Sequence, residues 1–259
     1  MPNKLERTGK LVNILQNRNG ASIKELAGEL AVSEMTVRRD LAQLRLDNII
    51  SLVHGAAIFK SPGNGNFGQN DYYLSLEKTV NNSEKDRIGR EAARMVEPGD
   101  TIIIDIGTTT ELVSKYIPPV HPITVLCFTM NALLELHKKK VENLIVGGGY
   151  YHPNTQLFES AETIALIQRT RATKYFLSAA GVSGEFGLTC ANQYEINVKQ
   201  ACIASSLKKI LLADSKKFDQ IRPAYFAPLD IVDTVITDSG IDPGWVHFME
   251  DMSIKVITV

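Results

Sequence analysis

The sequence predicts an α/β protein in two parts: a small helical module with a β-hairpin over residues 1–60, and a larger α/β domain with a mainly parallel sheet over residues 76–259. Two observations support this division. The first part shows apolar positions at helical spacing, interrupted by short polar turns. Beyond residue 84, apolar runs of strand length alternate with helical segments of about ten residues, which is typical of parallel sheets.

Composition restricts the class of protein. A net charge of −1, a hydrophobic fraction of 44% and a charged fraction of 22% are ordinary for a globular chain of 259 residues. No apolar run reaches the roughly 18 residues of a membrane span, and "MPNKLERTGK" lacks the apolar centre of a signal peptide, so we expect a cytoplasmic protein with no membrane partner. The three cysteines form no ligand pair and the five histidines show no metal-binding spacing, so we expect buried free thiols and no metal or cofactor.

Recognisable signals bound the first two helices. The first helix ends at "NRNG" and has an apolar face made of Leu5, Leu11, Ile14 and Leu15. Ser22 and Glu25 then form a capping box, in which the serine side chain accepts from an amide three residues on and the glutamate reaches back to the serine amide. The second helix buries an apolar side made of Ile23, Leu26, Ala27 and Leu30.

Ser33 caps the third helix, "SEMTVRRDLAQLRLD", in which Val37, Leu41 and Leu44 form one buried stripe. Six residues off that stripe are placed to contact a partner: Glu34, Met35, Thr36, Arg38, Arg39 and Arg45. Two short helices joined by a brief turn indicate a helix-turn-helix, whose second helix enters the major groove of double-stranded DNA. The alternative is a helical bundle in which the Arg pair lies on a solvated face.

After this helix, "NIISLVHGAAIFK" predicts two short strands around His54-Gly55, the wing of a winged helix-turn-helix domain. Charge supports a nucleic-acid partner. Residues 1–60 hold nine Lys and Arg against six Asp and Glu, a net charge of +3, whereas the remaining residues hold 19 against 23, a net charge of −4. A basic module beside an acidic domain is expected when a DNA-binding domain is joined to a domain with another task.

The motif "SEMTVRRDLAQL" followed by "VHGAAIF" closely resembles the N-terminal domain of the DeoR family of bacterial transcriptional regulators. It departs from the family at Leu52, where an arginine is usual, and at Ala56, where a glycine is usual. The resemblance implies that operator DNA is bound through Ser22, Ser33, Glu34, Met35, Thr36, Arg38, Arg39, Arg45 and His54.

Residues 61–75 are expected to form a linker, because the run "KSPGNGNFGQND" is rich in Gly and Asn and poor in side chains that pack. Beyond it, the alternating strands and helices predict βαβ units and a mainly parallel sheet covered on both faces. Ligands of such sheets bind beyond the carboxyl ends of the strands.

Four polar clusters follow predicted strands at that edge: Gly107–Thr110, Thr129 with Asn131, Gly147–Gly149, and Ser215–Lys217. The helix start after Gly107 favours an anion, and glycines let a backbone approach a ligand closely. Each cluster alone also has a structural explanation, such as helix capping or a tight turn, and Glu195 and Lys199, one helical turn apart, are explained by a surface ion pair. Together they predict one shared site for a phosphate or sugar.

The motifs "DIGTTT", "FTMN", "VGGGYY" and "LLADSKKFDQIRPA" are similar to successive motifs of the C-terminal sensor domain of the DeoR family, which is similar in fold to ribose-5-phosphate isomerase and the CoA transferases. The resemblance implies a phosphorylated sugar as effector, with deoxyribose-5-phosphate as one candidate. The residues it implies for effector binding are Asp105, Gly107, Thr108, Thr109, Thr129, Asn131, Gly148, Glu195, Lys199 and Lys217.

An enzyme and a sensor remain to be distinguished. An isomerase needs a carboxylate base over its substrate, and Asp105 and Glu195 are available. The stretch "SAAGV" at residues 178–182, where ribose-5-phosphate isomerases carry acidic residues, is uncharged. We therefore expect not an enzyme but a DeoR-type transcriptional repressor of a carbohydrate or nucleoside catabolic operon, which a phosphorylated sugar releases from DNA. The alternative is an isomerase-like enzyme with an accessory DNA-binding domain. Because operators usually contain repeated half-sites, we expect a homo-oligomer, either a dimer or a tetramer.

Overall fold

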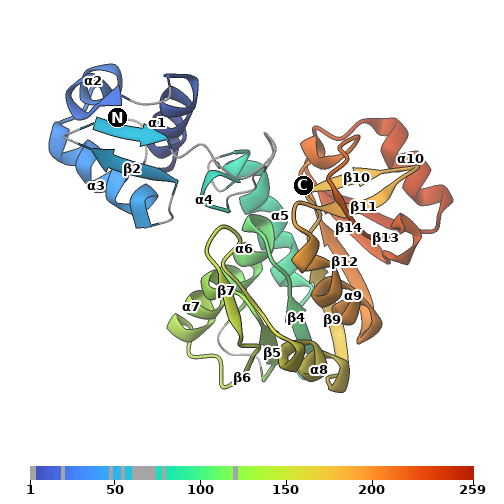
Figure 1. Cartoon of the computed structure of the whole chain (residues 1–259). Helices are drawn as coiled ribbons and strands as arrows, with labels where there is room; N and C mark the ends of the chain where they lie inside the picture. Colours follow the sequence, from blue (N-terminus) through green and yellow to red (C-terminus); the bar gives the residue numbers. More distant parts are fainter. Residues whose placement is uncertain are drawn as a thin grey trace. The chain divides into compact units, whose positions relative to one another are not determined.

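The computed structural model describes residues 4–18, 21–46, 49–53, 56–59, 74–77, 80–118 and 122–259. The chain divides into two compact units, Met1–Val80 and Asn81–Val259 (Figure 1). Most of the predicted linker lies outside the described residues, and its last two positions belong to α4 (Leu74–Glu77).

Up to Phe59, the described part of the first unit consists of three helices and a small antiparallel sheet. Its elements are α1 (Lys4–Arg18), β1 (Ala21–Ser22), α2 (Ile23–Glu29), α3 (Glu34–Leu46), β2 (Ile50–Val53) and β3 (Ala56–Phe59). The strands pair in the order β1-β3-β2. The predicted winged helix-turn-helix fold is confirmed, although the wing turn at His54-Gly55 lies outside the described residues.

Serine side chains begin α2 and α3, as predicted. The Glu25 amide donates to Ser22 Oγ at 3.2 Å and the Ser22 amide donates to Glu25 Oε2 at 2.8 Å, which completes the capping box. The Thr36 amide donates to Ser33 Oγ at 3.2 Å. The two caps fix where the helices start, so the apolar stripes of both helices face one core, which includes Leu11, Ile23, Leu26, Val37, Leu41 and Leu44.

An ion pair joins α1 to α3. Asp40 is 1% exposed on the inner side of α3, where its carboxylate accepts from Arg7 Nε at 2.5 Å and from Arg7 Nη2 at 3.2 Å. Two charge-assisted bonds to one planar guanidinium are strong and directional, and the hydrogen bond to Asp40 raises the pKa of Arg7. In the "RRDL" motif, Arg38 and Arg39 are therefore exposed at the surface, whereas Asp40 is buried.

Replacing Asp40 with alanine removes the acceptor of both bonds. We expect the free energy of unfolding of the first unit to fall by about 1.5–3 kcal/mol, the range for hydrogen bonds to charged groups. Hydrogen exchange at the amides of α1 and α3 measures this unit separately from the second. The control is Arg39→Ala at the adjacent exposed position, and equal losses in both variants would contradict the role given to Asp40.

The second unit is a parallel sheet with helices on both faces (Figure 1). The strands are β4 (Thr101–Ile104), β5 (Thr124–Cys127), β6 (Asn143–Val146), β9 (Ala172–Leu177), β12 (Ser206–Leu212), β14 (Thr234–Thr237) and β15 (Lys255–Thr258). Their order is β15-β14-β12-β9-β4-β5-β6, with parallel pairing throughout. Each of these strands, and the parallel sheet they form, was predicted from the alternating pattern.

Alternate residues of a strand face opposite sides of the sheet, so each strand contributes to two cores. Ile102 and Ile104 pack with α5 (Asn82–Arg94), α6 (Thr108–Tyr116) and α7 (Met130–Lys138). Ile103 packs on the other face with α8 (Ala161–Arg169), α9 (Ile196–Ala204) and α10 (Pro243–Asp251). Burial on both faces explains why these strands are almost continuously apolar.

The cysteines lie in the same cores. Cys127, Cys190 and Cys202 are buried free thiols, as predicted. Burial raises the pKa of Cys127 and of Cys190 to about 12.

Within the described ranges, no helix has the length and apolarity to cross a membrane.

Two smaller sheets were not predicted. One is the hairpin of β7 (Tyr150–His152) and β8 (Leu157–Glu159). The other is antiparallel, in the order β10-β11-β13, and is formed by β10 (Gly181–Ser183), β11 (Gly187–Cys190) and β13 (Ala224–Ala227). All of these strands are only three or four residues long, which is too short for alternation to mark them. Those of the β10-β11-β13 sheet also contain glycine or alanine, whereas β7 and β8 contain Tyr and Phe.

Candidate functional site

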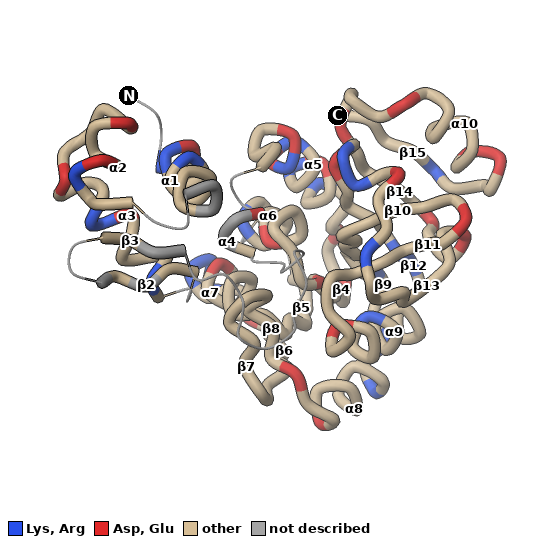
Figure 2. Tube along the Cα trace, turned by 45° about the horizontal axis from the view of Figure 1, so that its top comes forward, with Lys and Arg blue, Asp and Glu red and all other residues tan. Residues whose placement is uncertain are grey.

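The outer side of α3 is the candidate nucleic-acid interface. Glu34, Met35, Arg38, Arg39 and Arg45 are all exposed there, and basic positions occur along both α1 and α3 (Figure 2). Arg38 lies 3.8 Å from Glu34 in an exposed pair, which contributes little and is readily exchanged for a contact with DNA. Met35 is 67% exposed, and such an apolar side chain suits the methyl group of thymine.

The other predicted DNA-binding residues have structural tasks or lie outside the described part of the chain. Ser22 Oγ donates to Glu25 Oε2 at 2.7 Å, and Ser33 Oγ lies 2.9 Å from Thr36 Oγ1. These hydroxyls define the starts of α2 and α3 at the protein surface. His54 lies outside the described residues.

The candidate ligand site lies where the strand order of the sheet reverses. From β4 the sheet extends through β5 and β6, and from β9 it extends in the opposite direction through β12, β14 and β15. The loops that leave the carboxyl ends of β4 and β9 therefore lead in opposite directions, and sheets of this kind bind their ligands at such a point. Asp105 directly follows β4 and Ser178 directly follows β9, so both lie at this point.

A buried lysine connects the ends of β4 and β9. Lys199, on α9 and 1% exposed, donates from Nζ to Asp105 Oδ2 at 2.5 Å and to the Ser178 carbonyl at 3.0 Å. The Ser178 amide donates to the same Asp105 oxygen at 2.9 Å. The sequence pattern did not identify Ser178, because only the strand order shows that β9 adjoins β4. The simple explanation of Lys199 and Glu195 as a surface ion pair is wrong, since both side chains are buried.

Burial and neighbouring charges shift the pKa values of Glu195, Lys199 and Tyr175 at this point. Burial raises the pKa of Glu195, although Lys199 and hydrogen bonds from Asn192 act in the opposite direction. Those bonds run from the Asn192 amide and side chain to Glu195 Oε1 at 3.1 and 2.7 Å. Burial by itself lowers the pKa of Lys199, but the negative charges of Asp105 and Glu195 outweigh it and the pKa is raised. Burial also raises the pKa of Tyr175, and the charge of Asp105 adds to the effect.

Several oxygen atoms at this edge are buried without a hydrogen-bond partner among the described residues, and they include Asp105 Oδ1, Thr129 Oγ1 and Asn131 Oδ1. Leaving such an atom unpaired costs about 1–3 kcal/mol. Asn131 is held in place, because its amide nitrogen donates to Glu111 Oε2 at 2.9 Å. A ligand with hydroxyl groups supplies the partners that these oxygens lack.

The start of α6 adds a place for an anion. Gly107 has a φ of 151°, and an added Cβ would lie 3.1 Å from Thr110 Oγ1 and 3.2 Å from Ser178 Cβ, so glycine is required there. Thr108 and Thr109 form the first turn of α6, which no described side chain caps. Uncapped amides and the helix dipole favour a negative group such as phosphate.

The structure places Gly148 and Lys217 at the same edge but on other strands. Gly148 follows β6, and its carbonyl accepts from Ser160 Oγ at 2.9 Å and from Thr163 Oγ1 at 2.6 Å. An added Cβ at Gly148 would meet no protein atom, so the space beside it is open to a ligand, whereas at Gly147 it would lie 2.7 Å from Thr163 Cγ2. Lys217 belongs to η2 (Ser215–Lys217) after β12, and β9 separates β12 from β4.

The β7-β8 hairpin lies beside the site. The Phe158 amide donates to the Phe128 carbonyl at 2.8 Å, and Leu157 bridges Thr129, so β8 runs along the segment that carries Thr129. His152 stacks on Tyr194 with 3.7 Å between ring centroids. Tyr194 belongs to η1 (Gln193–Glu195), immediately before Glu195. The hairpin therefore connects the end of β5 with the segment that leads to Lys199, and the aromatic run "YYH" in the sequence was the signal for it.

The role of the lysine is open to a direct test. Lys199→Met leaves Asp105 as a buried carboxylate without its cation, and we expect the free energy of unfolding of the second unit to fall by about 3–5 kcal/mol. Adding Asp105→Asn removes the uncompensated charge and should restore most of that loss. Urea denaturation of the single and double variants measures both the loss in the free energy of unfolding and its recovery. If the two substitutions are simply additive, the pair does not stabilise the fold.

Family models match both the predicted DNA-binding part and the predicted sensor part of the chain. Residues 7–62 match the family model of the DeoR-like helix-turn-helix domain, and residues 80–239 match that of the DeoR C terminal sensor domain. Among solved structures, ribose 5-phosphate isomerase A of Methanocaldococcus jannaschii is similar with a TM-score of 0.41 and 13% identity, over 53% of this chain and 55% of that chain.

Three curated relatives extend over almost the whole chain. The HTH-type transcriptional regulator YulB of Bacillus subtilis is 32% identical over 98% of this chain and 96% of its own. The deoxyribose operon repressor of Escherichia coli K12 is 31% identical over 97% of each chain, and the lactose phosphotransferase system repressor of Lactococcus lactis is 30% identical over 93% of each. All three are named as transcriptional regulators or repressors, in agreement with the predicted regulatory function. The chain therefore belongs to the DeoR family of DNA-binding transcriptional regulators.

Proposed function

We propose that this regulator represses a carbohydrate or nucleoside catabolic operon and that a phosphorylated sugar releases it from operator DNA. One observation carries the proposal: a chain with an exposed helix-turn-helix surface also holds unpaired, buried oxygen atoms beside a charged pair and an uncapped helix start. Hydroxyl groups match the unpaired oxygens, and a phosphate matches the helix start.

DNA binding follows from the surface of α3. Arg38 and Arg39 are exposed near the start of the helix, where side chains of a recognition helix reach base edges. Arg45, at the other end of α3, is placed for a phosphate. Ser22, Ser33 and Thr36 hold the helix starts at the surface, where their hydroxyls can also meet the DNA backbone. Because operators usually repeat a half-site, we infer a homo-oligomer, a dimer or tetramer.

The effector releases DNA only if it prefers the conformation that binds DNA poorly. The start of the second unit offers a physical connection. Asn81, immediately before α5, donates from Nδ2 to Asp214 Oδ1 at 2.8 Å and accepts from Lys216 Nζ at 2.8 Å. Asp214 and Lys216 follow β12 at the edge of the sheet where the effector is proposed to bind. A ligand that shifts this segment therefore shifts the point at which the chain enters the sensor domain.

The identity of the sugar phosphate is a separate question. The relatives of about 30% identity bear the names of deoxyribose and lactose systems, so overall identity selects neither. Deoxyribose-5-phosphate is the candidate to test first, because the motifs resemble those of the deoxyribose operon repressor. The unphosphorylated sugar is the comparison that shows whether the helix start of α6 is used.

For DNA binding, Arg38→Ala should weaken affinity for the operator by roughly 1–3 kcal/mol if Arg38 reads a base. A mobility shift on the DNA upstream of the protein's own gene, repeated at several salt concentrations, measures this loss. If the slope of the logarithm of the binding constant against the logarithm of the salt concentration falls by about one, Arg38 contacts a phosphate instead. Arg94→Ala, at an exposed position of α5, is the control, and wild-type affinity in Arg38→Ala would remove Arg38 from the interface.

For effector binding, Thr129→Val removes a buried hydroxyl that lacks a partner within the described structure. We expect unchanged or slightly higher stability, because no protein hydrogen bond is lost, and a need for roughly three- to tenfold more sugar phosphate to release the DNA. Thr237→Val is a matched control, since Thr237 Oγ1 is also buried and unpaired but ends β14, three strands from β4. Equal responses of the two variants would remove Thr129 from the site.

A further inference from the structure

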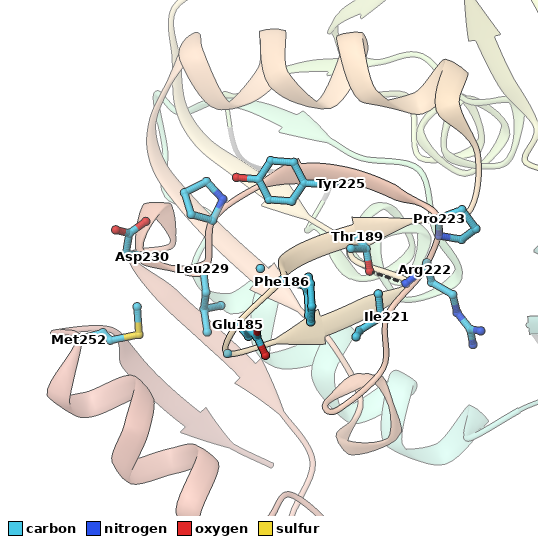
Figure 3. Close-up of a pocket in the computed structure, with 13 residues that line it drawn as sticks. Glu185, Phe186, Thr189, Ile221, Arg222, Pro223, Tyr225, Leu229, Asp230 and Met252 are labelled. Carbon is cyan, nitrogen blue, oxygen red and sulfur yellow. Dashed lines mark hydrogen bonds between the residues drawn. The ribbon is translucent and has the colours of Figure 1, made fainter.

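One end of the second unit carries an apolar surface that neither proposed site uses. A cavity of about 680 Å³ opens on the outer face of the β10-β11-β13 sheet (Figure 3). Three of the side chains that line it are large, apolar and about half exposed: Phe186 at 52%, Ile221 at 54% and Tyr225 at 53%. Large apolar side chains scattered singly on a surface need no explanation, but a contiguous group marks an interaction site.

The pairing of the strands explains why this face is apolar and open. Leu188 and Cys190 of β11 point into the core of the second unit. Thr189, between them, points the other way, and its cross-strand partners are Gly181 on β10 and Tyr225 on β13. Thr189 and Gly181 are themselves buried, with the Gln220 carbonyl over Gly181, so the exposed apolar surface on this side is formed by Tyr225 together with Phe186 and Ile221.

The cavity lacks the features of a small-molecule site. Thr189 Oγ1 accepts from the Arg222 amide at 2.9 Å and donates to the Gly181 carbonyl at 3.2 Å, so its hydrogen bonds are complete. None of the buried polar atoms that lack a partner in the described structure belongs to a residue lining this cavity. This contrasts with the effector site, where such atoms gather.

The apolar surface continues beyond the cavity. A second hollow of about 390 Å³ shares Gly184 with the first and is lined by Trp245 and Phe248. Phe248 is 40% exposed, and its ring lies 5.6 Å from that of Trp245. Trp245 Nε1 donates to Asp219 Oδ2 at 3.0 Å, so only the apolar body of the indole faces the surface. Aromatic side chains of this kind are enriched in the centres of protein–protein interfaces.

Charge identifies the partner. Figure 3 shows Arg222 and Asp230 at opposite ends of the cavity, with Phe186 and Ile221 between them. No ion pair joins either charge to another residue that the structure describes. We propose that this face binds the same face of a second copy of the chain, so that a two-fold axis passes through the apolar centre and Arg222 of each copy lies against Asp230 of the other. An interface of this symmetry requires a self-complementary patch. Arg222 and Asp230 provide opposite charges for it, and Glu185, which also lines the cavity, adds a second carboxylate. The proposal rests on the homo-oligomer inferred above and names its surface.

Sedimentation velocity of the full chain over a range of concentrations tests the proposal. Ile221→Asp places a charge at the centre of the patch and should weaken self-association at least about tenfold. Leu207→Asp is the control, because Leu207 is 72% exposed on β12 and lines neither hollow. Thermal unfolding of both variants separates loss of assembly from loss of the fold.

Charge reversal makes the test independent of folding defects. Arg222→Asp and Asp230→Arg should each weaken self-association, because like charges then face one another across the axis. The double variant R222D/D230R should recover it, since both pairs form again with their signs exchanged. An assembled wild-type protein that none of these substitutions weakens would overturn the surface and leave the oligomer standing. A monomeric wild-type protein would overturn both, whereas DNA release by a sugar phosphate is judged separately in the mobility shift.

Discussion

The fold of the second unit depends on one buried charged pair, Lys199 and Asp105, which lies where the strand order of the sheet reverses. A lone charge at Lys199 or Asp105 would be costly in this interior, so each requires the other. Because Lys199 comes from α9, Asp105 follows β4 and the Ser178 backbone follows β9, their hydrogen bonds fix three segments that are distant in sequence. The ends of β4 and β9 are thus held together without a ligand. Thr129 Oγ1 and Asn131 Oδ1 take no part in this bonding, and within the described residues they have no hydrogen-bond partner.

Local signals explain how much of the fold the sequence predicts. The capping box at Ser22 and the cap at Ser33 involve neighbours three residues apart, so the positions of α2 and α3 follow from the sequence alone. The strands of the parallel sheet are apolar on both faces and therefore stand out. Asp40 looks like one more surface charge in "RRDL", and only the packing of α1 shows that it is buried against Arg7. The β10-β11-β13 sheet escapes prediction because its short strands are defined by pairing across about forty residues.

In the candidate effector site, too, some features follow from local sequence and others depend on how distant segments pack. The polar residues at the ends of the predicted strands do lie at one edge of the sheet, since the carboxyl ends of parallel strands share an edge. Which of them meet depends on strand order, which one sequence does not reveal. Asp105 and Lys199 prove to be bonded although they are 94 residues apart in the chain. Gly148 and Lys217 follow strands that are not neighbours of β4 on the sheet. Their part in binding rests on the family resemblance and on a ligand large enough to reach them.

The buried thiols determine how the protein responds to oxidants. With a pKa of about 12, Cys127 and Cys190 are thiolates in only about one molecule in 10⁵ at neutral pH. The thiolate is the species that attacks peroxides and disulfides, and none of the three cysteines is exposed to either. A cell under oxidative stress therefore leaves this regulator's thiols intact. Its control of transcription is thus not coupled to redox poise through these thiols.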